Sequence, residues 1–413
     1  MINCVQKFCF CLIIFRNPFE LIVCITKENT ANVPITGRVE IGTVLDIYLK
    51  NVGLLCKEFL NFFLRSIETQ PMTWKSSISD CRRREILFND KSVLVTGGTG
   101  SFGKKFIEIL LKKYKPKRLI VYSRDEMKQF EMQQKFDDSC MRYFLGDVRD
   151  SERLKRAMYQ VDYVVHAAAI KQVPAAEYNP MECIKTNIHG AQNVINAAIE
   201  CGVKKIIALS TDKAANPVNL YGATKLCSDK LFTAANNYVG FRETRFSVVR
   251  YGNVVGSRGS VVPFFKKLKD EGAEFLPITD ERMTRFWLKL EDAVEFVFKS
   301  FQRMYGGEIF IPKLPSMRIM DLAKAIAPEL PTKVIGIRPG EKLHEVMCPS
   351  DIYYDTIEFE DHFVIKPSVR FCGADYETDA LGDKGHPVPD GFDYNSGNNP
   401  HFLTVEELRA MNP

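Results

Sequence analysis

A tyrosine and a lysine near the middle of the chain could do acid–base chemistry together. Tyr221 and Lys225 are four positions apart, so on a helix they share one face and the ammonium lies near the phenol. The positive charge lowers the pKa of the phenol, which can then take a proton from a substrate hydroxyl as hydride leaves. The spacing alone is common on protein surfaces, so its meaning depends on the elements around it.

An acid and a base stand side by side a few residues earlier. Asp212 and Lys213 follow Thr211 at the end of an apolar run, 204–211. Such a pair could give one proton and take another, although a local cap and a solvated lysine would use the same residues. We expect Thr211 to hydrogen-bond a substrate hydroxyl beside Tyr221.

A glycine-rich segment is typical of dinucleotide binding. The apolar run 92–97 leads into glycines spaced G-x-x-G-x-x-G, which allow backbone N–H groups to approach a pyrophosphate at a helix N-terminus. A tight strand–helix turn is the alternative, but this loop follows a strand, opens a helix and begins a repeating pattern. The cofactor-binding residues predicted here are Gly97, Thr99, Gly100, Ser101, Phe102 and Gly103, together with Ala167 after a later strand.

The end of the second strand bears on the choice of cofactor. An acid there usually holds the ribose 2′-hydroxyl of NAD, whereas a nearby arginine accommodates the 2′-phosphate of NADP. Here Arg124 comes before Asp125, which favours NADP, although Asp125 could also be an N-terminal acid of a solvated helix. The cofactor-binding residues predicted from this strand and the next are Ser123, Arg124, Lys128, Asp147 and Val148, and Tyr221 and Lys225 complete the set.

Short apolar runs alternate with segments of helical periodicity from residue 90 onward. Because these runs are apolar on both faces, we expect a parallel sheet covered by helices on both sides. The predicted strands are 92–97, 118–123, 141–148, 162–169, 204–211 and 246–254. The predicted helices include 102–114, 181–202, 262–270, 290–303 and 318–329. The fold class is therefore α/β: a Rossmann-type doubly wound parallel sheet with a smaller mixed α/β C-terminal substrate-binding region.

The domain boundaries follow from the same pattern. We assign residues 86–255 to the NADP-binding Rossmann domain, 256–372 to the substrate-binding region and 373–413 to a loop-rich tail. Residues 1–85 form an N-terminal extension, which we expect to be dispensable or foreign to the natural protein. Its apolar stretch, 3–24, is interrupted by charges and shorter than the ~20 residues of a spanning helix, so no membrane span is predicted. Segment 41–65 has helical periodicity and is predicted to be an amphipathic helix.

Composition excludes several classes of function. The 413 residues carry 56 Lys and Arg against 51 Asp and Glu, a net charge of +5 that is too small to predict nucleic-acid binding. The 12 cysteines and 6 histidines show no metal-site spacing, so no metal is predicted. Without a signal for an oxidising compartment, we expect reduced thiols and a cytoplasmic location.

Longer segments add specificity to the short motifs. They are STDKAANPVNLYGATK (210–225), RYGNVVGSRGSVVPFF (250–265), MTRFW (283–287) and RPGEKLHE (338–345). With the glycine loop, they resemble the extended short-chain dehydrogenase/reductase superfamily and, within it, the inverting UDP-N-acetylglucosamine 4,6-dehydratases. The resemblance covers about residues 86–413.

The resemblance implies an NADP-dependent enzyme acting on UDP-N-acetylglucosamine. Tyr221, with Thr211 and Lys225, would oxidise C4, and Lys213 would remove the C5 proton with a pKa depressed by burial or by Lys225. Asp212 would protonate the departing C6 hydroxyl. Hydride would return to C6, and Lys213 would reprotonate C5 from the opposite face. The implied product is UDP-2-acetamido-2,6-dideoxy-β-L-arabino-hexos-4-ulose.

Further positions are carried over from the resemblance. The implied substrate-binding residues are Lys171, Asn253, Val254, Arg258, Val261, Thr279 and Arg338. Asn187 matches a helix asparagine whose usual role is structural, and relatives form homo-oligomers. Two enzymatic alternatives stay open: a UDP-sugar 4-epimerase and a dehydratase without C5 inversion, with Lys213 as the residue that separates them from the leading hypothesis. An NADP-binding sensor or scaffold protein is an alternative of another class, against which the presence of Tyr221 and Lys225 weighs.

Overall fold

The computed structural model describes residues 11–17, 20–25, 87–256, 260–369 and 374–412. The chain divides into two compact units, residues 1–82 and 83–413. In the first unit, β1 (Cys11–Asn17) pairs antiparallel with β2 (Glu20–Ile25), so part of the apolar stretch forms a hairpin. The helix predicted at 41–65 lies outside the described residues. In the described part of the chain, no helix combines the length and apolar character needed to cross a membrane.

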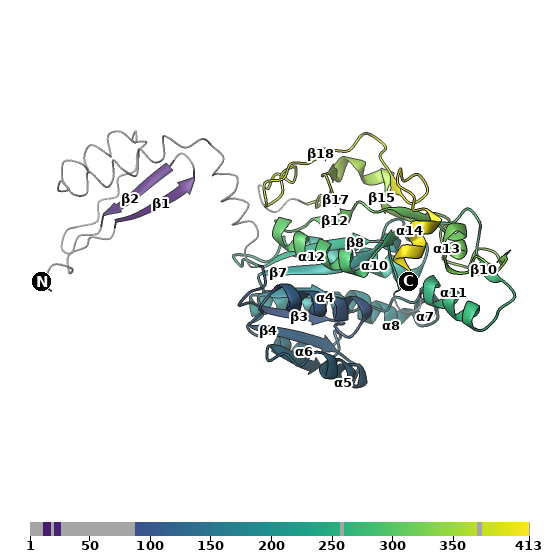
Figure 1. Cartoon of the computed structure of the whole chain (residues 1–413). Helices are drawn as coiled ribbons and strands as arrows, with labels where there is room; N and C mark the ends of the chain where they lie inside the picture. Colours follow the sequence, from purple (N-terminus) through teal and green to yellow (C-terminus); the bar gives the residue numbers. More distant parts are fainter. Residues whose placement is uncertain (1–10, 18–19, 26–86, 257–259, 370–373, 413) are drawn as a thin grey trace, which may run out of the picture. The chain divides into compact units, whose positions relative to one another are not determined.

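A ten-stranded sheet is the frame of the second unit (Figure 1). Seven of its strands are parallel, in the order β5-β4-β3-β6-β7-β8-β12. Their bounds are β3 (Ser92–Thr96), β4 (Arg118–Ser123), β5 (Met141–Leu145), β6 (Tyr163–His166), β7 (Lys205–Thr211), β8 (Arg245–Tyr251) and β12 (Ile309–Pro312). The strand order reverses between β3 and β6, as in a Rossmann sheet. The predicted doubly wound α/β fold is confirmed.

Two hydrophobic layers bind helices to opposite faces of this sheet, because successive side chains of a strand point to opposite sides. In β3, Leu94 packs in the layer under α6, α9 and α10, whereas Val93 and Val95 pack in the layer under α4, α5 and α12. The bounds of these helices are α4 (Ser101–Lys113), α5 (Glu126–Lys135), α6 (Ser151–Met158), α9 (Gly190–Cys201), α10 (Leu220–Ala235) and α12 (Leu290–Arg303).

Two predicted elements are interrupted in the structure. The helix predicted at 181–202 consists of α8 (Pro180–Ile184), a π-helical turn (Lys185–His189) and α9, and the short α7 (Val173–Tyr178) precedes it. The strand predicted at 246–254 ends as β8 and continues as β9 (Asn253–Val254), which pairs with β11 (Thr284–Leu288). Between them, a Cβ on Gly252 would lie 2.6 Å from the Cβ of Phe286, so the backbone needs glycine to make this passage.

The elements after residue 255 build a second core and extend the sheet. The second core contains Phe265, Trp287, Leu322 and Leu408. The elements that contribute to it are α11 (Val261–Asp270), β10 (Leu276–Ile278), β13 (Ser316–Arg318), α13 (Ile319–Ile326) and α14 (Val405–Met411). The remaining strands are β14 (Thr332–Val334), β15 (Val346–Cys348), β16 (Thr356–Glu358), β17 (His362–Ile365), β18 (His386–Pro387) and β19 (Tyr394–Asn395). Antiparallel β17, β16 and β18 extend the large sheet beyond β12, and β19 pairs with β15.

One aromatic side chain joins the sheet to two of its helices. Phe88, just before β3, is fully buried, and its ring meets five others at centroid distances of 5.2–6.1 Å. The five rings are those of Phe106, Tyr114, Tyr163, Phe298 and Phe301.

We expect Phe88→Ala to lower the free energy of unfolding by about 3–5 kcal/mol, because it leaves a cavity where five rings now pack. The matched control is Phe130→Ala on α5, where the side chain is 59% exposed and the change should stay within about 0.5 kcal/mol. Urea unfolding followed by circular dichroism measures both values. Equal losses in the two variants would contradict this account of the core.

Candidate active site

A cavity of about 380 Å³ opens at the C-terminal ends of β3, β6 and β7, beside the point where the strand order reverses. In open α/β sheets this is where ligands bind, and the volume is in the range of small-molecule sites. The sequence-predicted residues that line the cavity are Gly97, Gly100, Ser101, Phe102, Gly103, Ala167, Lys171, Thr211, Asp212, Lys213, Tyr221, Lys225, Asn253 and Val254.

The glycine loop needs its glycines for steric reasons. Gly97 has φ of +64°, and a Cβ there would lie 2.9 Å from the backbone of Ala168 after β6. A Cβ on Gly103 would lie 2.4 Å from the carbonyl oxygen of Gly98, so α4 can approach the loop this closely only with glycine. These contacts fix a tight turn between β3 and α4.

The start of α4 is open toward the cavity. Gly100 is the N-cap residue, and among the described residues no side chain caps this helix and no acid stands in its first turn. Backbone N–H groups at such an end can bind the phosphates of a dinucleotide, so the residues present fit that group. Thr99 is buried beside the loop and lies outside the cavity lining.

The acid after β4 has a local role. Asp125 is the N-cap of α5: its carboxylate accepts a hydrogen bond from the backbone N–H of Lys128 at 2.9 Å and pairs with the ammonium of the same lysine. These contacts lower the pKa of Asp125, the side-chain bond from Lys128 first. The hydroxyl of Ser123 accepts a hydrogen bond from Gln129 at 3.0 Å.

Arg124 lies near Asp147 at the same strand end. Its side chain is 56% exposed, and its Nη1 lies 3.5 Å from Oδ2 of Asp147, which Arg149 binds more closely at 2.6 Å. Val148 is buried in the core, where a Cβ on Gly190 would meet it. The cofactor-binding residues predicted from these strand ends that lie outside the cavity lining are Ser123, Arg124, Lys128, Asp147 and Val148.

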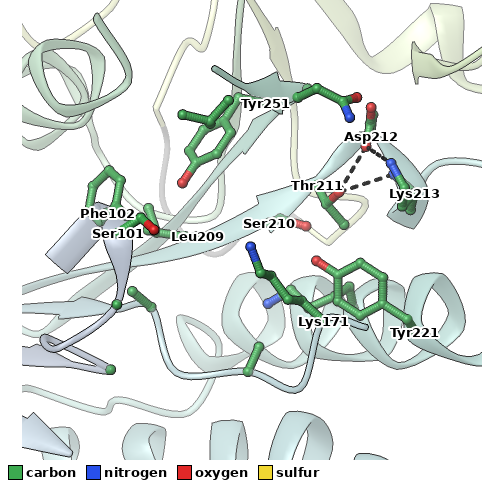
Figure 2. Close-up of a pocket in the computed structure, with 18 of the residues that line it drawn as sticks. Ser101, Phe102, Lys171, Leu209, Ser210, Thr211, Asp212, Lys213, Tyr221 and Tyr251 are labelled. Atoms are coloured by element: carbon green, nitrogen blue, oxygen red, sulfur yellow. Dashed lines mark hydrogen bonds and ion pairs between the residues drawn. The ribbon is translucent and has the colours of Figure 1, made fainter. Parts of the chain in front are cut away.

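The acid–base pair lies at the end of β7, where a 3₁₀ turn (Asp212–Ala214) begins. Oδ1 of Asp212 accepts a hydrogen bond from the hydroxyl of Thr211 at 2.8 Å and one from Nζ of Lys213 at 3.1 Å. Figure 2 shows these side chains on the same side of the cavity as Tyr221, with Phe102 and Tyr251 across from them. Oδ2 of Asp212 is buried and has no hydrogen-bond partner within the described part of the chain.

The charge state of Lys213 differs from the sequence-based expectation. We expected burial or Lys225 to depress the pKa of Lys213. Burial does act in that direction, but the carboxylates of Asp212 and Glu345 outweigh it and raise the pKa of Lys213 above its usual value. Nζ of Lys213 lies 3.2 Å from Oε1 of Glu345. Lys213 is therefore an ammonium held between two carboxylates.

The pKa of Tyr221 is also influenced by a different cation from the one expected. Burial raises the pKa of Tyr221 to about 12, and the nearby charge of Lys213 and a hydrogen bond with Thr211 partly offset it. Burial lowers the pKa of Lys225, which the charge of Asp229 partly restores. The pKa of the phenol is therefore raised, whereas the sequence predicts that Lys225 lowers it, and the charge that lowers it most is that of Lys213.

A single asparagine fixes the loop on the other side of the cavity. Asn187, in the π-helical turn, donates from Nδ2 to the carbonyl of Ile170 at 2.9 Å and accepts from the N–H of the same residue at 2.8 Å. Nδ2 also lies 3.0 Å from the hydroxyl of Thr224 on α10. These contacts connect the segment before Lys171 to the helix that carries Tyr221, which is the structural role expected of Asn187.

The implied substrate-binding residues divide into two groups. Those that line the cavity are Lys171, Asn253 and Val254. Those outside its lining are Val261, Thr279 and Arg338, whereas Arg258 lies outside the described residues. Arg338 is exposed, with Nη1 3.9 Å from a carboxylate oxygen of Glu341 in the same segment.

Sequence reasoning missed several side chains at the site, among them Tyr251, Ser210 and Glu345. Tyr251 lines the cavity, and its ring stacks on that of Phe102 at 6.4 Å. Ser210 also lines it and donates to the buried carboxylate of Asp229 at 2.8 Å. Glu345, beside Lys213, lies in a segment used only for the resemblance, and no local spacing relates it to β7. Among the described residues, no group of acids, cysteines or histidines is arranged to hold a metal ion.

Comparisons with known proteins place this chain among described relatives. The chain matches the polysaccharide biosynthesis protein family over residues 93–367. It is 66% identical over 324 residues to the UDP-N-acetylglucosamine 4,6-dehydratase (inverting) of Campylobacter jejuni, covering 78% of this chain and 97% of that one. It is 42% identical over 333 residues to the UDP-glucose 4-epimerase of Rickettsia massiliae, covering 79% and 96%. The solved structure of Pen from Bacillus thuringiensis has 39% identity and a TM-score of 0.72, covering 79% and 98%.

These matches confirm the resemblance that the sequence motifs indicated. The family match covers more than half of the chain, and the Campylobacter relative is matched over nearly its whole length. The chain belongs to the polysaccharide biosynthesis protein family and, within it, to the group of the inverting UDP-N-acetylglucosamine 4,6-dehydratases.

Proposed function

We propose that the protein is a UDP-N-acetylglucosamine 4,6-dehydratase that inverts C5, giving UDP-2-acetamido-2,6-dideoxy-β-L-arabino-hexos-4-ulose. The observation that carries this proposal is that Asp212, hydrogen-bonded to Thr211 and to Lys213, lines the same cavity as Lys213 and Tyr221. Oxidation of a hydroxyl needs only the tyrosine side of this group. Loss of water also needs an acid and a base, and the Asp–Lys pair supplies both.

The cofactor we propose is NADP. The uncapped start of α4 and the glycine loop fit a dinucleotide diphosphate. Asp125 is engaged as the cap of α5, whereas Arg124 is exposed beside the end of β4, an arrangement that favours a 2′-phosphate over a 2′-hydroxyl. A nicotinamide held there would supply hydride transfer, as acceptor of the hydride from C4 of the sugar and as its donor to C6.

Tyr221 acts in the first half of the proposed reaction by taking the proton of the C4 hydroxyl. Burial raises the pKa of Tyr221, and the nearby charge of Lys213 partly offsets this and favours the phenolate that the step requires. Thr211 in turn donates to Asp212 at 2.8 Å, so a proton collected by Tyr221 has a hydrogen-bonded route to the Asp–Lys pair. The C4 ketone that results makes the C5 proton acidic.

Asp212 and Lys213 act in the second half. Lys213 takes the C5 proton, and Asp212 gives a proton to the departing C6 hydroxyl, which leaves as water. After hydride has returned to C6, the ammonium of Lys213 protonates C5 from the opposite face and inverts it. Both residues line the cavity from one short turn after β7, which supports a concerted role.

A 4-epimerase is the second candidate, because a relative with that name is 42% identical over most of both chains. An epimerase needs no acid for a leaving hydroxyl, and by resemblance the ordinary 4-epimerases carry small residues at the Asp212–Lys213 positions. The paired side chains, both in contact with the cavity, therefore favour the dehydratase.

We expect the full-length protein, given UDP-N-acetylglucosamine in deuterated water, to yield a product lighter by one water with deuterium at C5. Lys213→Met should lower turnover about 10²- to 10⁴-fold, because it removes the group that exchanges the C5 proton. Mass spectrometry and proton NMR follow the sugar. The matched control is Lys205→Met at the other end of β7, where the lysine donates to the carbonyl of Phe301 at 2.7 Å.

Other products would contradict this assignment in different ways. The galacto isomer at unchanged mass would make the protein an epimerase. A dehydrated product that keeps the original C5 configuration would make it a non-inverting dehydratase. No conversion, together with tight NADP binding, would favour the sensor or scaffold hypothesis.

We expect Arg124→Ala to weaken NADP binding about ten- to a hundred-fold and to leave NAD binding nearly unchanged, because only NADP has a 2′-phosphate for the guanidinium to bind. Titration calorimetry with each cofactor measures the effect. Arg142→Ala is the matched control, because this arginine lies near the start of β5 and donates to the carbonyls of Ser139 and Met141. An equal loss for both cofactors would argue against a 2′-phosphate site at Arg124.

A further inference from the structure

Glu345 is a buried carboxylate at the edge of the active site with no role in the reaction described above. It is 2% exposed, and its Oε1 lies 3.2 Å from Nζ of Lys213. Its Oε2 has no hydrogen-bond partner in the described part of the chain. A buried carboxylate is costly unless a nearby charge compensates it, so its place beside an ammonium calls for an explanation.

Separate segments hold Glu345 in this place. Its backbone N–H donates to the hydroxyl of Ser396 in the C-terminal tail at 2.9 Å. Arg285 on β11 donates to the carbonyls of Lys342 and Leu343 at 3.0 and 3.1 Å, and its Nε lies 3.7 Å from Oε1 of Glu345. The carboxylate is therefore fixed by the C-terminal region, while Lys213 is fixed by the Rossmann sheet.

The same segment is also tied to the turn that carries the acid–base pair. Nζ of Lys342 donates to the carbonyl of Ala215 at 2.6 Å and lies 3.9 Å from Oε2 of Glu345. The charged and titratable groups that face Lys213 are thus Asp212, Glu345, Arg285, Lys342 and Tyr221.

We propose that Glu345 is a positioning residue that holds Lys213 as an ammonium, so that Lys213 becomes the C5 base only by passing a proton to Asp212. This inference rests on the proposed dehydratase function. It explains how one turn can supply an acid and a base together: a single proton shift over 3.1 Å turns a Lys213 ammonium and an Asp212 carboxylate into a neutral amine and a carboxylic acid.

Asp212 and Glu345 both contact the ammonium, but only one can deliver the proton to a substrate. Asp212 lines the cavity, and its Oδ2 is without a hydrogen-bond partner among the described residues. Glu345 is absent from the cavity lining and lies beside Arg285 and Lys342. The proton that reaches the substrate therefore passes through Asp212, which lines the cavity.

The step balances as follows. The ammonium proton of Lys213 moves to Asp212, and the neutral amine then takes the C5 proton, whose electron pair forms the C5–C6 double bond. The C6–O bond breaks, and the leaving hydroxide takes the Asp212 proton as water. Lys213 is again an ammonium and Asp212 a carboxylate. Glu345 stays beside Lys213 through these transfers and stabilises the ammonium that forms again when the amine takes the C5 proton.

Glu345→Gln in the full-length protein tests this role. With UDP-N-acetylglucosamine, we expect kcat to fall about 10- to 100-fold with KM nearly unchanged. The alkaline limb of the kcat–pH profile should begin about 1–3 pH units lower than in the wild type, because loss of the negative charge lets the Asp–Lys pair lose its proton at lower pH. Glu345→Asp keeps the charge at a greater distance, so its limb should lie between the other two.

The matched control is Glu308→Gln, which neutralises a buried carboxylate away from the site. Glu308 accepts hydrogen bonds from the hydroxyl of Ser247 at 2.6 Å and from the N–H of Gly306 at 2.8 Å. This variant should lower stability and leave the pH profile unchanged. An alkaline limb at the wild-type pH in both Glu345 variants would overturn the proposal, even if their stability or kcat falls.

A second readout separates this inference from the proposed function. Carbon-13 NMR of lysine labelled at Cε follows the titration of Lys213, with its signal assigned by its loss in Lys213→Met. Lys213 should titrate at lower pH in Glu345→Gln than in the wild type, and an unchanged titration would refute the role of Glu345. A wild-type protein that leaves UDP-N-acetylglucosamine intact would overturn the proposed function, while this titration would still decide the role of Glu345 in the charge of Lys213.

Discussion

The ammonium of Lys213 between two buried carboxylates is the interaction on which the site depends. Removing any one of these charges from water is costly, and only their close pairing compensates for it. Asp212 comes with Lys213 from the end of β7, but Glu345 comes from the far end of the chain and is fixed by Arg285 and Ser396. The C-terminal region therefore supplies one of the charges that surround Lys213 at the end of β7. It also covers that edge of the Rossmann sheet.

The parallel sheet explains why these parts meet at one edge. The C-terminal ends of β3, β6 and β7 lie together, so the glycine loop, Ala167 and Thr211 line one cavity although they are far apart in the sequence. At Gly252 the chain leaves the sheet, and β9 pairs with β11. That pairing connects the Rossmann sheet to the strand that carries Arg285, and through it to Glu345.

The sequence predicts most of this frame but only part of the site. Apolar β-branched runs mark the parallel strands because both faces of such a sheet are buried. The π-helical turn around Asn187 has no such mark, because it arises from contacts of the side-chain amide with Ile170 and Thr224. The sequence also does not predict the direction in which the pKa of Lys213 shifts. Burial alone predicts a lower pKa, and the charges of Asp212 and of Glu345, which the fold brings beside Lys213, together reverse the sign.

The two halves of the proposed reaction differ in how close in the sequence their residues lie. Oxidation relies on Tyr221 and Thr211, which stand close in sequence at the end of β7 and the start of α10. Elimination also uses Lys213 in our proposal, and the charge of Lys213 is proposed to depend in part on Glu345, which lies in a distant segment. A short motif can thus identify the dehydrogenase chemistry, whereas the step that makes a dehydratase depends on how the C-terminal region packs against the sheet. This division is consistent with relatives of different reaction type sharing the same Rossmann frame.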